Sequence, residues 1–176
     1  MSNILIVVDM QNDFITAALG TEEAVAILPR VVERINTAVD NGETVIFTRD
    51  THTVDYLQTQ EGTRLPVPHC ILETAGWEIA DALQPYAQHC MIIDKPTFGS
   101  LALAQTLKEL NCEEEIGSVT LIGLCTDICV ISNAMLIKAA LPEVRVAVEA
   151  ACCAGVTPES HDNALKAMAM CQIDII

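Results

Sequence analysis

Aromatic residues are scarce in this chain and make up only 3% of its 176 residues. Hydrophobic residues of all kinds nevertheless reach 51%, so the apolar content is mostly aliphatic. A chain of this length can bury a sizeable core. We therefore expect a single domain over residues 1–176, built around aliphatic rather than aromatic side chains.

Positive charge is also scarce. Nine Lys and Arg stand against 24 Asp and Glu, which gives a formal net charge of −15. Such a chain is repelled by nucleic acids and by anionic membranes. No apolar run reaches the ~20 residues that a membrane-spanning helix needs. We expect neither nucleic acid nor membrane as a partner.

Recognisable disulfide or export features are missing as well. The chain has eight cysteines, but disulfide scaffolds are typically shorter and richer in loops, and most of these cysteines lie inside apolar stretches. The N-terminal run Met1–Asp9 has no basic region and no cleavage site, and is typical of a strand. We expect a cytoplasmic protein with reduced thiols.

Short aliphatic runs alternate with helical patterns along the chain. Runs that are apolar throughout favour a parallel sheet covered on both faces. The pattern predicts a three-layer α/β/α Rossmann-like domain with a mostly parallel sheet of about six strands. The predicted strands are Ile4–Val8, Glu43–Thr48, Cys90–Ile93, Val119–Ile122, Val144–Val148 and Ile173–Ile176. The predicted helices are Glu22–Asp40, Trp77–Leu83, Leu101–Leu110, Ile128–Ala140 and Pro158–Met170, the last with Thr157 as N-cap.

Polar residues follow several predicted strands. Asp9 follows the first, Asp50 and His52 the second, and Lys95 the third. Ligands of open α/β sheets bind beyond the carboxyl ends of the strands. Each residue alone is more often structural, as a cap or a solvated side chain. Their meeting at one sheet edge is what favours a functional site.

Cys129 lies where the fourth strand passes into a helix. Unpaired N–H groups and the helix dipole at such a position lower the pKa of a thiol, towards ~3.5–7.5 in favourable sites. We therefore interpret Cys129 as a candidate nucleophile for acyl transfer, with Asp9 to move a proton and Lys95 to stabilise the thiolate. Most of the other cysteines are typical of core residues.

Three motifs resemble the isochorismatase-like cysteine hydrolases over nearly the whole chain. They are Asp9–Phe14 (DMQNDF), Lys95–Ser100 (KPTFGS) and Gly123–Val130 (GLCTDICV). The resemblance implies a catalytic triad of Asp9, Lys95 and Cys129. It also implies a cis peptide bond at Leu124–Cys125, with the backbone N–H groups of Cys125 and Cys129 as the oxyanion hole.

A second constellation is similar to the metal site of nicotinamidases. It comprises Asp50 and His52, followed by His69 directly before a cysteine. One carboxylate and two imidazoles suit a divalent metal, foremost Zn²⁺ and also Mn²⁺ or Fe²⁺. Loop histidines that bond to backbone groups are the simpler alternative. Glu61, in the same long loop over residues 50–74, is either a support for the metal site or a solvated side chain.

The resemblance implies nicotinamide deamidation to nicotinate and ammonia, and with it a role in NAD salvage. Nicotinamidases commonly have a tryptophan three residues before the ligand histidine, where this chain has Pro66, which leaves Phe14 and Phe98 as the expected ring contacts. Hydrolysis of another small amide or carbamoyl compound by the same triad is the alternative. A metal- or ligand-binding protein without catalysis is a third. The family commonly forms dimers or tetramers, so a homo-oligomer is expected.

Overall fold

A computed structural model describes all residues, 1–176, and contains one six-stranded sheet in which every neighbouring pair of strands is parallel. The strands lie in the order β3-β2-β1-β4-β5-β6. Their bounds are β1 Ser2–Val8, β2 Thr44–Asp50, β3 Met91–Lys95, β4 Ile116–Leu124, β5 Arg145–Ala154 and β6 Asp174–Ile175. This confirms the predicted fold class and the existence of all six strands.

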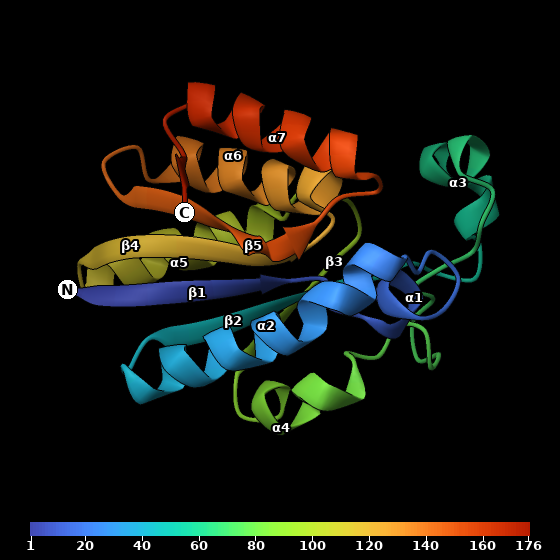
Figure 1. The fold of residues 1–176 in the computed structure, drawn as a ribbon, viewed down its shortest axis with the longest axis horizontal. Helices are drawn as coiled ribbons and strands as arrows, with labels where there is room; N and C mark the ends of the chain where they lie inside the picture. The colour runs from blue at the N-terminus through green and yellow to red at the C-terminus, as the bar shows by residue number, and fades with distance from the viewer.

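Helices cover both faces of the sheet (Figure 1). The longer ones are α2 Glu22–Asp40, α5 Leu101–Glu113, α6 Ile131–Ala140 and α7 Pro158–Met170. The shorter ones are α1 Asn12–Ile15, α3 Gln60–Arg64, α4 Gln84–Ala87, the 3₁₀ turns η1 Tyr56–Gln58 and η2 Asp81–Leu83, and the π-helical turn η3 Thr126–Val130. None of the helices combines the length and the apolar character needed to cross a membrane.

Strand β1 shows how the sheet separates two cores. Successive side chains of a strand point to opposite faces. Ile4, Ile6 and Val8 accordingly join the core beneath α5, α6 and α7, whereas Leu5 and Val7 join the core beneath α2. The first core is built only from aliphatic and sulfur-containing side chains, and the second adds Phe47 as its one fully buried aromatic.

Two helices have the predicted bounds, and both begin at a threonine. Thr21 accepts a hydrogen bond from the Ala24 N–H at the start of α2, and Thr157 forms a capping box with Ser160 at the start of α7. The helix predicted over Trp77–Leu83 is wrong. Ile79 pairs with Gln11 in an isolated bridge, and helical structure begins only at Asp81.

The strand order reverses direction between β1 and β4, which both lie in the middle of the sheet. Such a switch point opens a crevice at the carboxyl ends of the strands. In Figure 1, α1 and α3 lie at that end, to the right. The residues that follow β1, β2, β3 and β4 therefore meet beside these two helices.

Candidate active site and metal centre

Lys95 links the residues predicted at the sheet edge. Its Nζ lies 2.6 Å from Asp9 Oδ2, 3.2 Å from Asp50 Oδ1 and 3.5 Å from Cys129 Sγ. It also donates to the Thr97 carbonyl. Asp9, Lys95 and Cys129 are all buried. The three predicted triad residues are thus in mutual reach at the end of β1, the end of β3 and the turn after β4.

Thr48 holds Asp9 from the neighbouring strand, a contact that sequence reasoning did not find. Its hydroxyl donates to Asp9 Oδ1 over 2.6 Å. Asp9 has a φ of +48°, in the left-handed region that few residues other than glycine adopt. Residues with such strained backbone tend to lie at functional sites.

The prediction of a lowered thiol pKa for Cys129 is wrong. Burial raises its pKa well above the ordinary value, and the carboxylates of Asp9 and Asp50 add to this, while Lys95 opposes them. Burial also raises the pKa of Asp9 against the pull of Lys95. The resting thiol therefore keeps its proton, and a carboxylate able to hold that proton lies in the same buried cluster.

The turn that carries Cys129 has the expected shape. The peptide bond Leu124–Cys125 is cis, and η3 follows it directly. The N–H groups of Ile128 and Val130 both donate to the Cys125 carbonyl. Cys125 and Cys129 thereby line the same cavity.

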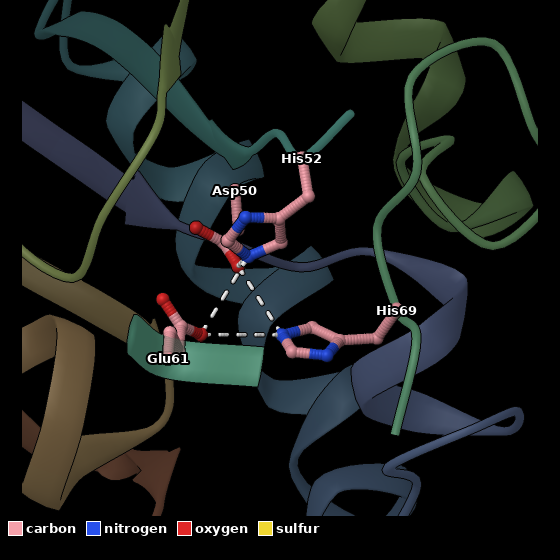
Figure 2. Close-up of side chains that lie close together, drawn as sticks. All are labelled: Asp50, His52, Glu61 and His69. Carbon is pink, nitrogen blue, oxygen red and sulfur yellow. Dashed lines mark hydrogen bonds and ion pairs between the residues drawn. The ribbon is translucent and has the colours of Figure 1, made fainter. Parts of the chain in front are cut away.

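Four side chains gather beside the triad as possible metal ligands (Figure 2). The ligand atoms of Asp50, His52, Glu61 and His69 all lie within 4.8 Å of one another. The structure thus brings the three predicted ligands together and adds Glu61, which comes from α3 and whose role the sequence left open. An irregular loop has no periodicity from which this fourth position could be predicted.

The donor set fits a divalent metal. His52 Nε2 lies 2.9 Å from Asp50 Oδ2 and 3.6 Å from Glu61 Oε1, and His69 Nε2 lies 3.6 and 3.7 Å from the same two oxygens. Ligands around a tetrahedral Zn²⁺ at about 2.0–2.1 Å are roughly 3.3 Å apart. His69 Nδ1 lies 2.8 Å from the Val67 carbonyl, which leaves Nε2 as the metal-binding nitrogen.

A cavity of about 270 Å³ opens onto both groups of residues. Its lining includes Cys129 and Cys125 together with Asp50, Glu61 and His69. The remaining wall is mostly apolar and consists of Phe14, Leu19, Thr21, Leu65, Phe98, Ile128 and Val156. Phe14 and Phe98, the two predicted ring contacts, thus both line it. No Lys or Arg does.

Trp77 takes no part in this wall. Its ring packs against the Arg49 guanidinium, which lies 3.6 Å from the ring centroid, and its indole N–H donates to Thr51. Pro66 does not line the cavity either, whereas its neighbour Leu65 does. The aromatic content of the site is therefore limited to the two phenylalanines and the nearby Tyr56, which packs against both histidines.

Fold and site together define an α/β domain with a small-molecule cavity at the switch point of its sheet. The isochorismatase domain model matches residues 3–176, and the chain belongs to that family. Its relatives place it among hydrolases that act on amides.

Three relatives illustrate the similarity. A nicotinamidase of Schizosaccharomyces pombe is 26% identical, over 98% of this chain and 91% of its own. The structure of the nicotinamidase/pyrazinamidase PncA from Bacillus subtilis has a TM-score of 0.84 at 30% identity, with 99% of each chain covered. The structure of a Pyrococcus horikoshii pyrazinamidase in complex with zinc has a TM-score of 0.81 at 25% identity, covering 100% of this chain and 99% of that one.

Proposed function

We propose that the protein is a cysteine amidohydrolase that converts nicotinamide and water to nicotinate and ammonia. One observation carries the proposal: a single cavity is lined by Cys129 and by three of the four possible metal ligands. A small ring amide can therefore touch the thiol and the metal centre at once. Relatives named nicotinamidase and pyrazinamidase support this substrate class.

The first half of the reaction uses the buried triad. Asp9 takes the thiol proton as Cys129 Sγ attacks the amide carbon, and Lys95 balances the negative charge of the cluster. Backbone N–H groups of Cys125 and Cys129 would hold the oxyanion. Asp9 then gives the proton to the departing nitrogen, so that ammonia leaves and a thioester remains on Cys129.

Hydrolysis of the thioester completes the cycle. Asp9 removes a proton from water, whose oxygen attacks the thioester carbon, and that proton returns to the sulfur as nicotinic acid leaves; the acid then loses its remaining proton to solvent and becomes nicotinate. Asp50, His52, Glu61 and His69 would hold the divalent metal, most simply Zn²⁺. Held there, the metal would supply a Lewis acid for the ring nitrogen of the substrate.

The cavity favours a neutral ring amide over carbamoyl compounds that carry a carboxylate. Its wall is mostly apolar, its charged groups are the acids Asp50 and Glu61, and no Lys or Arg lines it to pair with an anion. A substrate carboxylate that enters the cavity would lose its bound water without gaining a positively charged partner, which disfavours its binding. Phe14 and Phe98 can instead contact the faces of a planar ring.

Ammonia release from a panel of amides tests the proposal. We expect nicotinamide and pyrazinamide to be hydrolysed and N-carbamoyl amino acids to react far more slowly. Cys129→Ala should lose activity by at least roughly 10⁴-fold, and intact-protein mass spectrometry of the rapidly quenched wild type should find the acyl-enzyme. Preferred release from carbamoyl compounds would support the alternative substrate class. Release from no amide would favour a binding protein, and full activity of Cys129→Ala would refute the nucleophile.

A further inference from the structure

Gln11 is fully buried and holds the backbone of Asp50 from both sides. Its side-chain Oε1 accepts from the Asp50 N–H over 2.7 Å, and its Nε2 donates to the Asp50 carbonyl over 2.8 Å. The same Nε2 donates to the Trp77 carbonyl, also over 2.8 Å. An amide is suited to this position because it offers a donor and an acceptor together. These bonds fix the main chain of Asp50 and do not involve the Asp50 carboxylate.

Asp13 holds the main chain next to His69. Its Oδ2 accepts from the buried N–H of Cys70 over 2.7 Å, and its Oδ1 accepts from the Ala18 N–H over 3.3 Å. Gly76 leaves the space for this carboxylate, since a Cβ there would lie 2.1–2.4 Å from its atoms. Cys70 itself has a φ of +46°. The bond from Asp13 therefore stabilises an unfavourable backbone conformation directly after a metal-ligand candidate.

The other side of the same segment is tied to His52. The His52 N–H donates to the Cys70 carbonyl, and the Leu72 N–H donates to the His52 carbonyl, both over 2.9 Å. Cys70 is thus fixed through its N–H by Asp13 and through its carbonyl by His52. These bonds set the separation of the two imidazoles, whose ring centroids lie 4.9 Å apart.

We propose that Gln11 and Asp13 are positioning residues for the metal centre, Gln11 through Asp50 and Asp13 through His69. Neither is one of the four metal-ligand candidates. The inference rests on the proposed metal site. Asp9, two residues before Gln11, belongs to the triad, so alternate residues of one short segment serve the nucleophile and the two ends of the metal centre. The segment thereby ties the backbone near Asp50 and His69 to Asp9, which contacts Lys95 beside the thiol.

The variants follow from the bonds that each residue makes. Asp13→Ala leaves the Cys70 N–H without its acceptor, whereas Asp13→Asn keeps an acceptor oxygen of similar reach. Gln11→Met has nearly the same size and adds no charge, but it loses both the acceptor for the Asp50 N–H and the donor to the Asp50 carbonyl. Loss of partners outside the ligands typically weakens metal binding about 10–100-fold. We expect a loss of that size for Asp13→Ala and Gln11→Met, and near wild-type affinity for Asp13→Asn.

Zinc affinity of the metal-stripped full-length protein, measured by competition with a chromophoric chelator, is the test. Asn111→Ala is the matched control because Asn111 also accepts a backbone N–H, that of Ile116, at the opposite end of the sheet. It should bind zinc as the wild type does. Wild-type affinity in both Asp13→Ala and Gln11→Met would overturn the proposal, as would an equal loss in Asn111→Ala.

Two further outcomes separate this proposal from the metal site itself. If the wild type binds no zinc, or His52→Ala binds zinc as the wild type does, the metal site is refuted rather than its positioning. If Asp13→Ala does not fold, Gln11→Met decides alone, because it replaces the amide by an uncharged group of nearly the same size. Wild-type zinc affinity in Gln11→Met would then overturn the proposal.

Discussion

Lys95 is the residue through which the candidate triad and the metal ligands meet. Its Nζ is fully buried and contacts a carboxylate of each group, Asp9 and Asp50. Burial alone would lower its pKa, but the carboxylates of Asp9 and Asp50 raise it, so Lys95 remains a cation. A buried charge is tolerated only where partners surround it. The cluster therefore depends on Lys95 for stability as well as for chemistry.

Removing this cation should destabilise the whole protein. Lys95→Ala leaves two carboxylates buried without their partner, and we expect the free energy of unfolding to fall by about 3–5 kcal/mol. Asp9→Asn should then cost less in the Lys95→Ala background than in the wild type. Without Lys95 the negative charges of Asp9 and Asp50 repel each other unopposed, and Asp9→Asn removes that repulsion. Asn also tolerates the positive φ of Asp9. Urea unfolding of the four proteins measures the coupling.

Lys166→Ala is the control, since Lys166 is exposed and forms no ion pair in the structure. Its effect should stay within about 0.5 kcal/mol. Additive costs of Lys95→Ala and Asp9→Asn would show that the two side chains do not interact in the folded protein.

At the scale of elements, the junction of β4 with η3 places the nucleophile. Gly123 pairs across the sheet with Val8 of β1, directly before Asp9. Its φ is +114°, and a Cβ at this position would lie 2.2 Å from the Val8 carbonyl oxygen. Only glycine lets β4 approach β1 this closely and turn into the segment that carries Cys125 and Cys129.

Gly123→Ala should therefore destabilise in two ways, through backbone strain and through the clash with Val8. We expect a loss of at least about 2 kcal/mol. Gly42→Ala is a matched comparison, because Gly42 also has a positive φ, +71°, but no atom lies within 4 Å of the added Cβ. It should lose only about 1 kcal/mol. Equal losses in urea unfolding would contradict a packing requirement at Gly123.

The elements that could be predicted are those with a local cause. The strands follow from aliphatic runs, and α2 and α7 begin at threonines that cap them. The region of Trp77–Leu83 has equally apolar residues, but a bridge from Ile79 to Gln11 and the bond from the Ala80 N–H to the Met10 carbonyl keep these two residues out of a helix, which begins only at Asp81. Such long-range bonds override local propensity and leave no trace in the spacing of residues.

The candidate site likewise combines features that the sequence predicts with features that it does not. Asp9, Asp50 and Lys95 lie close to the strand ends where the aliphatic runs predicted them. The raised pKa of Cys129 depends on burial and on carboxylates from other strands, which outweigh the local effect of the turn. Tertiary contacts bring Glu61 to the other ligands and form the hydrogen bonds between Gln11 and the main chain of Asp50 and from the Cys70 N–H to Asp13. No pattern in the chain could have specified them.

The molecule as a whole is acidic, and some of its carboxylates lie at or beside the cavity. Its formal net charge is −15, and three carboxylates, Asp9, Asp50 and Glu61, gather at the switch point of the sheet. Burial raises the pKa of Glu61, and the charge of Asp50 adds to this, against the pull of His52, His69 and Lys95. A divalent cation bound here would offset this repulsion in the folded state, where the four ligands are assembled, and not in the unfolded chain.

Zinc should therefore stabilise the folded protein by mass action. At a free zinc concentration 100 times the Kd, the free energy of unfolding should rise by about 2.7 kcal/mol, and a chelator should reverse the rise. Chemical unfolding of the metal-stripped protein, with and without zinc, measures this rise.

His52→Ala should lose most of the rise in the free energy of unfolding, since it removes a ligand. Glu61→Gln should keep a smaller increment at the same zinc concentration, because its side chain still reaches the site but binds the metal less tightly. An increment in Glu61→Gln equal to that of the wild type would exclude Glu61 as the fourth ligand, and an increment preserved in His52→Ala would place the zinc outside this site.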